Sequence, residues 1–360
     1  MRSILAKTAA IILAAVLLLP QRAEAVSAKR AVLLEPVSGR LLYEKSPGER
    51  APMASTTKIM TALLICEQCN VLDRMRIPRE AVGIEGSSMY LQEGEVLTVQ
   101  ELLYGLMLSS GNDAAVALAI YCGGTAEGFV ERMNDKARVL GLADTHFANP
   151  NGLDAPDHYS TARDLAKLGA YAMENPIFAK TVSTKNVTVG KRYLKNHNKL
   201  LWLVDGADGI KTGYTRSAGR ILVSSAQRQG RRLVAATMDA PQDWQDHEAL
   251  LNRGFEDFAP RLLISAGEQL GERRLMGGEG TVRLLSSQDF TYALGREEQP
   301  QIVLGSREFV YAPVVQGGEA GWAYVLLSGK VIGKVGLVYG ETVEKELPAK
   351  KPFWKIGRKQ

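Results

Sequence analysis

ASTTKIM, at residues 54–60, places Ser55 three residues before Lys58 at the start of an apolar run. The apolar residues that follow recur at helical spacing, which predicts a buried helix from Ser55 to about Cys69. Because residues three apart on a helix lie one above the other, the Lys58 amine can reach the Oγ of Ser55. By itself the pattern S-x-x-K is weak, since average composition gives about one per chain of this length.

Two further motifs follow in the chain, Ser110-Gly-Asn112 and Lys211-Thr212-Gly213. Each motif also has a plain structural interpretation. Ser55 could be a helix cap, S-G-N could end a helix in a left-handed turn, and K-T-G could be ordinary strand residues. Average composition predicts K-T-G far less than once per chain. Together, and in this order, the three motifs are the set of serine enzymes that act on penicillin and on D-Ala-D-Ala peptides.

The first motif supplies a nucleophile and a base without a histidine. A serine hydroxyl is a weak nucleophile and needs a base beside it. Lysine is a base only when neutral, and its reference pKa is about 10.4. Burial in the apolar helix and a nearby cation would both lower the pKa of Lys58. We expect Lys211 to be that cation.

The other two motifs supply groups for the substrate. Between two helices, Ser110 can relay a proton to the leaving amine, and the Asn112 amide can hold the substrate backbone. On an edge strand, Lys211 and Thr212 offer a charge and a hydroxyl to a terminal carboxylate. Gly213 allows the substrate to approach that strand closely.

The sequence resembles the low-molecular-mass penicillin-binding proteins, the serine-type D-alanyl-D-alanine carboxypeptidases. The resemblance covers about residues 28–258 and is carried by APMASTTKIMTALL, LLYGLMLSSGNDAAVALA, FANPNGLDAPDHYSTARDLAKL, GIKTGYTRSAGRILVSSAQRQGRRLVAATMDA and WQDHEALLNRGF. It implies that the penultimate D-Ala carbonyl of a peptidoglycan stem peptide acylates Ser55, that D-Ala leaves and that water frees the shortened peptide. It also implies covalent inhibition by β-lactams and an oxyanion hole formed by the N–H groups of Ser55 and Tyr214.

Two features depart from this family. Many members end in a longer amphipathic anchor helix, whereas this chain ends in KPFWKIGRKQ. Some members place an arginine near the segment that corresponds to MDAPQDWQDHE, residues 238–248, to meet the substrate carboxylate. Because no arginine stands there, we expect Lys211 and Thr212, or another group, to carry more of that role.

The order of elements predicts an α+β fold for residues 26–260. Strands stand at both ends of this segment, around Ser38-Gly39 and from about Thr181 onwards, and helices lie between them. An antiparallel sheet with helices packed on it satisfies this order, as in a penicillin-binding/β-lactamase-like domain. Gln229-Gly230 is typical of a hairpin turn between two strands.

A second, smaller domain is predicted for residues 261–345. Its short strands are separated by turn residues every eight to twelve positions, which is typical of an all-β sandwich. Residues 346–360 form a basic tail with Phe353 and Trp354, which could contact an anionic membrane surface or stay a solvated terminus.

The first 25 residues have the pattern of a secretory signal peptide: a basic start, a short apolar run and the small-x-small sequence Ala23-Glu-Ala25. We therefore expect export across the cytoplasmic membrane, to a secreted or membrane-associated location. Without this segment the net charge falls from +5 to about +3, which is too mild to indicate nucleic-acid binding.

Cysteines and histidines give no indication of a metal or cofactor. Cys66 and Cys69 lie within an apolar helix and, unlike a redox pair, do not follow a strand, so we expect buried thiols. Cys122 has no evident role. The four histidines do not pair at metal-ligand spacing. His158 is predicted to be a structural loop residue.

Three other protein classes compete with the carboxypeptidase for this sequence. A class A β-lactamase shares the motifs, but its deacylating glutamate has no counterpart in the loop ANPNGLDAPDHYS. A β-lactam-acylated sensor or binding protein would acylate without turnover, but such sensors normally carry membrane helices and a cytoplasmic domain. A Ser-His-Asp hydrolase is disfavoured because no G-x-S-x-G occurs.

Overall fold

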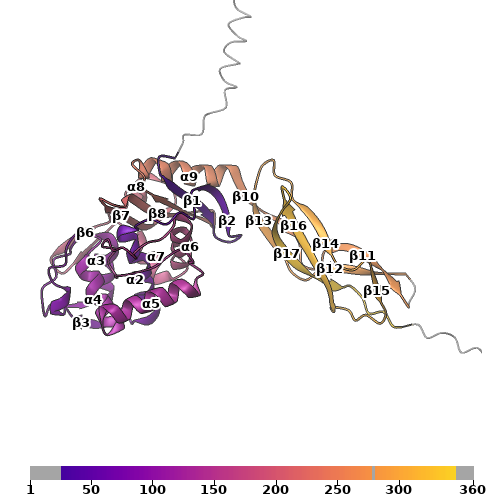
Figure 1. Ribbon diagram of the computed structural model, residues 1–360, viewed down its shortest axis with the longest axis horizontal. Helices are drawn as coiled ribbons and strands as arrows, with labels where there is room; N and C mark the ends of the chain where they lie inside the picture. Colours follow the sequence, from indigo (N-terminus) through magenta and orange to yellow (C-terminus); the bar gives the residue numbers. More distant parts are fainter. Residues whose placement is uncertain (1–25, 278–279, 346–360) are drawn as a thin grey trace, which may run out of the picture. The chain divides into compact units, whose positions relative to one another are not determined.

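The computed structural model describes residues 26–277 and 280–345. The chain forms two compact units. The first contains residues 26–36 and Leu41–Gly254, and the second contains Val37–Arg40 and the described residues from Phe255 onwards (Figure 1). The predicted signal peptide at residues 1–25 and the basic tail at residues 346–360 lie outside the described residues.

The first unit is built on a five-stranded sheet with the strand order β2-β1-β9-β8-β7. The neighbouring strands β1 and β9, β9 and β8, and β8 and β7 pair in antiparallel fashion, as predicted. The β8–β9 hairpin turns at Gln229-Gly230, where both residues have positive φ. The strands are β1 (Arg30–Glu35), β2 (Arg40–Lys45), β7 (Ala207–Thr215), β8 (Gly219–Arg228) and β9 (Arg231–Met238).

Helices cover both faces of this sheet (Figure 1). Gly169 of α6 (Ala162–Ala172) lies against Val223 and Val234, while Gly254 of α9 (Asp243–Asp257) lies against Leu33 and Leu233. Since neighbouring strand residues point to opposite faces, Leu233 and Val234 meet different helices. The two central strands are therefore apolar on both sides.

Helix α2 (Lys58–Gln68) lies at the centre of the first unit and contacts most of its other helices. Its residues 58–66 are all buried, as expected for a helix inside the core. The others are the 3-10 turns η1 (Ala54–Thr57) and η2 (Arg79–Ala81) and the helices α3 (Val99–Leu108), α4 (Asn112–Gly123), α5 (Ala126–Val139), α7 (Pro176–Ser183) and α8 (Leu200–Leu203).

Helix α8 occurs within the region from about Thr181 that the sequence indicated as β-rich, and α7 ends at the start of that region. The N-terminus of α7 is fixed locally, because the Asn175 side chain accepts hydrogen bonds from the N–H groups of Ile177 and Phe178. Pro176 fits the first helical position. Short hairpins complete the unit: β3 (Arg74–Arg76) with β4 (Val96–Thr98), and β5 (Asn186–Val189) with β6 (Arg192–Lys195).

The second unit is all-β, as predicted. A two-stranded sheet pairs β10 with β13, and a six-stranded sheet has the order β14-β16-β17-β12-β11-β15. Its main core consists of Ile264, Leu284, Ala323, Val325, Val335 and Leu337. The strands are β10 (Phe258–Ile264), β11 (Gln269–Met276), β12 (Thr281–Ser286), β13 (Phe290–Gly295), β14 (Gln301–Gly305), β15 (Phe309–Tyr311), β16 (Glu319–Leu327) and β17 (Lys330–Tyr339).

Two absences concern the described residues alone. No helix there is both long and apolar enough to cross a bilayer. No group of three or more His, Cys, Asp or Glu side chains within residues 26–277 and 280–345 is placed to hold a metal ion.

Candidate active site

Ser55 and Lys58 form the centre of the site. Ser55 lies in η1, and Lys58 is the first residue of α2. The Lys58 Nζ donates a hydrogen bond of 3.1 Å to the Ser55 Oγ and one of 2.7 Å to the Asn112 Oδ1, and it also donates to the carbonyl oxygen of Asn151. The side chain is completely buried. The spacing of the first motif thus places an amine on a serine hydroxyl.

Burial controls the charge of this amine. It lowers the pKa of Lys58 well below its ordinary value, and the charge of Lys211 lowers that pKa further, against an opposing effect of Asp113. These are the two causes expected from the sequence. Burial also lowers the pKa of Lys211, to about 7. The lowered pKa of Lys58 favours its neutral amine, the form that can accept a proton.

Ser110 occupies a strained position between α3 and α4. Its φ of 61° lies in the left-handed region, which is costly for a residue with a Cβ. Its Oγ is buried and has no hydrogen-bond partner among the described residues. An unsatisfied hydroxyl in a functional cleft is suited to a partner that arrives with the substrate.

Asn112 begins α4 and joins the base to a neighbouring loop. Besides accepting from Lys58, its side chain donates from Nδ2 to the Glu85 carbonyl oxygen over 2.5 Å. Its backbone N–H donates to the Ser87 carbonyl oxygen over 2.7 Å. The sequence predicts that the Asn112 amide holds the substrate, and in this structure that amide is a hydrogen-bond partner of Lys58.

The third motif lies on β7 beside η1. The Lys211 Nζ donates to the Thr212 carbonyl oxygen over 2.9 Å. A Cβ on Gly213 would stand 3.2 Å from the backbone N of Ser55, so glycine is needed here for the approach of β7 to the nucleophile's own turn. The sequence had indicated instead that this glycine admits the substrate.

A cavity of about 300 Å³ opens on these groups. Of the predicted residues, its lining contains Ser55, Ser110, Thr212, Gly213 and Tyr214, while the other three predicted residues lie buried behind them. The lining also contains Ser87, His197, Arg220, Asp243 and Trp244, which the sequence motifs did not identify. All eight predicted residues are therefore brought together.

Arg220 is the most informative of the additional residues. It stands on β8, one position after the glycine that pairs with Thr215 of β7. Its Nη2 bonds the Asp243 Oδ2 over 2.9 Å, and its guanidinium lies 5.7 Å from the centre of a Trp244 ring. Arg220 lies far from residues 238–248 in the sequence, and pairing in the sheet places it next to that segment, so the sequence did not predict it.

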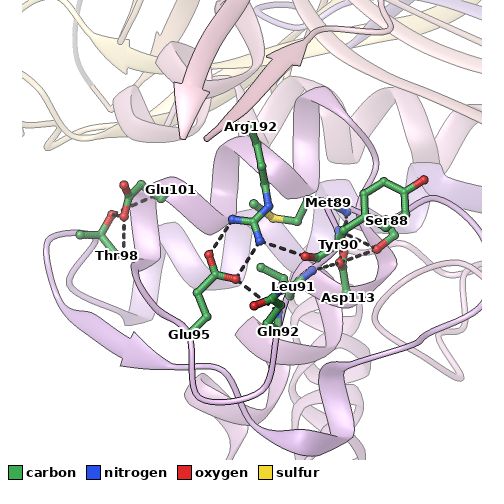
Figure 2. Close-up of polar contacts among 10 residues, drawn as sticks. All are labelled: Ser88, Met89, Tyr90, Leu91, Gln92, Glu95, Thr98, Glu101, Asp113 and Arg192. Carbon is green, nitrogen blue, oxygen red and sulfur yellow. Dashed lines mark hydrogen bonds and ion pairs between the residues drawn. The ribbon is translucent and has the colours of Figure 1, made fainter. Parts of the chain in front are cut away.

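The loop that carries Ser87 is fastened to α4 by one carboxylate (Figure 2). Asp113 accepts from the Ser88 Oγ over 2.6 Å and from the N–H groups of Met89 and Leu91 over 3.1 Å. Such charge-assisted bonds to a buried carboxylate are strong. Asp113 follows the second motif directly, so this loop and Asn112 are positioned by adjacent residues.

A second fastening lies on the other side of the loop (Figure 2). Arg192 of β6 bonds both carboxylate oxygens of Glu95, over 2.6 and 2.8 Å, and donates to the carbonyl oxygen of Tyr90 over 2.9 Å. A bidentate guanidinium–carboxylate pair fixes orientation as well as distance. The cleft wall around Ser87 is therefore held at two points.

His158 is buried and forms hydrogen bonds within the turn that carries Ser55, which agrees with a structural role. Its Nδ1 accepts from the N–H of Ala148 over 2.9 Å, so Nε2 carries the proton and donates to the Thr57 Oγ1 over 2.7 Å. Thr57 in turn donates to the carbonyl oxygen of Ala54 over 2.8 Å. Burial lowers the pKa of His158 to about 4, which keeps the ring neutral.

The three thiols lie away from the catalytic cavity. Cys66 is buried as expected, and burial raises the pKa of its thiol to about 12. Cys69 and Cys122 are only half-buried, so the expectation of buried thiols is wrong for Cys69. The reason is position, since Cys69 follows the last residue of α2 and leaves the helix with extended backbone.

Known proteins are similar to this chain in sequence and in fold. The family model for D-alanyl-D-alanine carboxypeptidase matches residues 19–242, and that for the C-terminal domain of penicillin-binding protein 5 matches residues 258–345. The chain is 32% identical over 335 residues to the D-alanyl-D-alanine carboxypeptidase DacF of Bacillus subtilis, an alignment that covers 88% of this chain and 86% of the relative.

Solved structures agree. Penicillin-binding protein 5 from Haemophilus influenzae superposes with a TM-score of 0.76 at 31% identity, over 89% of this chain and 98% of that one. A mutant of the Streptomyces K15 DD-transpeptidase superposes with a TM-score of 0.63 at 34% identity, over 64% and 99% of the two chains. Together with the Ser55–Lys58 contact described above, these matches show that the chain belongs to the D-alanyl-D-alanine carboxypeptidase family.

Proposed function

We propose that the protein is a serine carboxypeptidase that removes the terminal D-Ala from peptidoglycan stem peptides through an acyl-enzyme on Ser55. The observation that carries this proposal is the buried amine of Lys58, whose pKa is lowered well below its ordinary value and which lies 3.1 Å from the Ser55 Oγ. A neutral amine at that distance can take the hydroxyl proton.

The proposed acylation uses the groups around the cavity. Lys58 accepts the proton as the Ser55 Oγ attacks the carbonyl of the penultimate D-Ala. The N–H groups of Ser55 and Tyr214 face the oxygen on which charge develops. The proton that Lys58 has taken then passes through the Oγ of Ser110, which is otherwise unsatisfied, to the nitrogen of the leaving D-Ala, and Lys58 is neutral again. Water then attacks the ester with Lys58 again as the base, and Ser55 is restored.

The substrate carboxylate is assigned to Thr212, Lys211 and Arg220. Thr212 and Arg220 both line the cavity, and a guanidinium is the side-chain cation best suited to a carboxylate. A guanidinium binds a carboxylate through parallel N–H bonds, which suits a small substrate that must be oriented. We infer that Arg220 supplies the charge that other members of the family place nearer residues 238–248.

The substrate sets the location of the enzyme. Members of this family act on peptidoglycan, so the enzyme works outside the cytoplasmic membrane. We propose that residues 1–25 direct this export and that β-lactams acylate Ser55 in place of the peptide.

We also propose that the basic tail at residues 346–360 can contact an anionic membrane surface. Liposomes with and without anionic lipid, incubated with the protein, would test that contact.

The activity is tested by D-alanine release from a peptide that ends in D-Ala-D-Ala, with Ser55→Ala as the matched variant. A labelled penicillin is run beside it. Release and a covalent adduct that are both lost in the variant are expected. An adduct without release would instead favour a β-lactam-acylated sensor, and efficient penicillin hydrolysis would favour a β-lactamase. Absence of both signals would contradict the proposal.

A further inference from the structure

Two cysteines meet near the surface of the first unit, where two helices end. Cys69 directly follows the last residue of α2, and Cys122 is the second-last residue of α4. Both side chains are half-buried, and the Cys69 thiol donates a hydrogen bond to the Cys122 sulfur. This bond brings the two sulfur atoms next to each other, and a disulfide requires two cysteines at such close range.

The same two helices carry groups of the proposed active site at their other ends. Helix α2 begins with Lys58 and α4 begins with Asn112, and the Lys58 Nζ donates to the Asn112 Oδ1 over 2.7 Å. Because the helices are 11 and 12 residues long and meet at both ends, they run side by side in the same direction. A bond between the two cysteines would therefore join the far ends of the helices that position the proposed base.

Other contacts already hold these helix ends in place. The Tyr121 hydroxyl donates to the Asp73 Oδ2 over 2.9 Å, which joins α4 to the turn after α2. As a thiol, Cys122 donates to the Gln68 Oε1 over 3.5 Å. Arg132 of α5 donates to the same Oε1 over 3.1 Å and to the Cys122 sulfur over 3.9 Å. Since both helix ends are fixed, the two sulfurs can be joined with little movement of the backbone.

Cys122 is the more reactive thiol of the pair. The hydrogen bond from Cys69 lowers the pKa of Cys122, as does the charge of Arg132, while burial opposes both. A thiolate beside an arginine is the form that attacks a disulfide. Cys66 lies in the apolar core, where burial raises the pKa of its thiol to about 12, so it does not compete for either partner.

We propose that Cys69 and Cys122 form a disulfide in the exported protein and that this bond locks α2 against α4. The inference is independent of the reaction at Ser55 and needs only the location outside the cytoplasmic membrane, where disulfides persist. The oxidant is another disulfide, either of a thiol oxidoreductase or of a small thiol compound.

The oxidation proceeds by two exchange steps. The Cys122 thiolate attacks the oxidant, and a mixed disulfide forms as one thiolate leaves. Cys69 then loses its proton and attacks the Cys122 sulfur, which releases the second thiolate. The two protein thiols are oxidised, and the oxidant is reduced to two thiols.

The bond closes a loop of about 50 residues, which restricts the unfolded chain and so stabilises the folded one. This loop contains the turn with Ser110 and the cleft wall around Ser87. The disulfide would therefore brace the segment that forms one side of the catalytic cavity.

The test uses the protein exported into a bacterial periplasm. It is denatured with an alkylating agent that caps free thiols, and its peptides are then analysed by mass spectrometry. The melting temperature is measured with and without dithiothreitol. Cys69→Ser and Cys122→Ser break the pair, whereas the control Cys66→Ala removes the third thiol and keeps the pair.

The expected result is a linked pair of peptides that contain Cys69 and Cys122, with Cys66 alkylated. Reduction should lower the melting temperature of the wild type by at least about 5 °C. The same shift should persist in Cys66→Ala, even if its altered core melts earlier. It should be absent in both serine variants, which should melt near the reduced wild type.

Three results would overturn the inference. Alkylation of all three cysteines would show that no disulfide forms in the exported protein. A link from Cys66 to either of the others would show that the pairing is wrong. A linked pair whose reduction leaves the melting temperature unchanged would show that the bond does not lock the two helices together.

Discussion

The two units of the molecule treat ionisable side chains differently. The first unit buries Lys58, Lys211, Asp113, His158 and His247 completely or almost completely. In the second, among the described residues, Ser286 is the one buried polar side chain, and its charged side chains stay at the surface. Burying a charge costs free energy unless it is paired or neutralised. The comparison teaches that ionisable side chains are buried in the first unit, where the proposed acyl transfer needs an amine without a proton. The second unit contains none of the proposed catalytic groups and buries no ionisable side chain among its described residues.

The largest effect on activity is expected when the proposed base, the buried amine of Lys58, is removed. Lys58→Met keeps the length and apolar stem of the side chain but lacks the amine. Penicillin acylation and D-alanine release should fall about 10²–10⁴-fold, the usual contribution of a general base. The variant should remain folded, as circular dichroism would show. Residual activity within tenfold of the wild type would mean that Lys58 is not the base.

Removing the cation at the carboxylate should have the next largest effect. Arg220→Gln should raise KM for the D-Ala-D-Ala peptide about tenfold or more, because a hydrogen bond to a charged group contributes about 1.5–3 kcal/mol. The double variant with Asp243→Asn controls for the unpaired carboxylate, since Asp243 is buried and bonded to Arg220. An unchanged KM in both variants would leave the carboxylate to Thr212 and Lys211.

The pH dependence of acylation should reflect the second buried lysine. Because burial lowers the pKa of Lys211 to about 7, its positive charge is lost as the pH rises through neutrality. Penicillin acylation should therefore decline severalfold between about pH 7 and pH 9. In Lys211→Arg the guanidinium keeps its charge, so the decline should disappear. An alkaline decline of the same size in that variant would assign it to another group.

Between pH 7 and pH 5, the first unit should lose more stability than the second, because it buries two histidines. Burial lowers the pKa of His158 to about 4 and that of His247 to about 3, below the ordinary value near 6.5 of an unfolded chain. The unfolded state therefore binds protons first, and stability is lost as the pH falls from about 6.5 towards 4. Urea titrations at pH 7 and pH 5 should show this loss, which should be smaller in His158→Gln. An equal loss in the transition of the second unit would contradict the comparison.

The smallest effect on activity is expected in the second unit. Leu284→Ala should destabilise its core by about 2–5 kcal/mol, because Leu284 is fully buried. D-alanine release by the variant should stay within about twofold of the wild type at a temperature where the first unit is folded. A parallel loss of release would show that the catalytic unit depends on its neighbour.

Much of the site could be predicted because its residues carry their chemistry in short, local patterns. The S-x-x-K spacing fixes the Lys58–Ser55 contact through the geometry of one helical turn, and burial of α2 follows from its apolar composition. The β8–β9 hairpin was likewise evident from Gln229-Gly230. These features depend on neighbours in the sequence.

Other features could not be predicted because tertiary contacts decide them. Arg220 meets Asp243 only once β8 and the start of α9 are placed together. Asp113 looks like an ordinary acidic residue in the first turn of a helix until the loop at Ser88–Leu91 folds onto it. A hollow of about 820 Å³, lined by residues that include Tyr193, Lys195 and Trp202, assembles from α8, the β5–β6 hairpin and the turn before α4, and no sequence motif describes that combination.

The left-handed backbone of Ala54 and Ser110, with φ of 46° and 61°, has a consequence for how this enzyme can evolve. Each residue with a Cβ in that region costs about 1–3 kcal/mol, and the two flank the nucleophile's cleft. Glycine at position 110 would relieve the strain and lose the hydroxyl at once. The most stable version of this cleft is therefore an inactive one, and selection for stability alone would drive the protein away from catalysis.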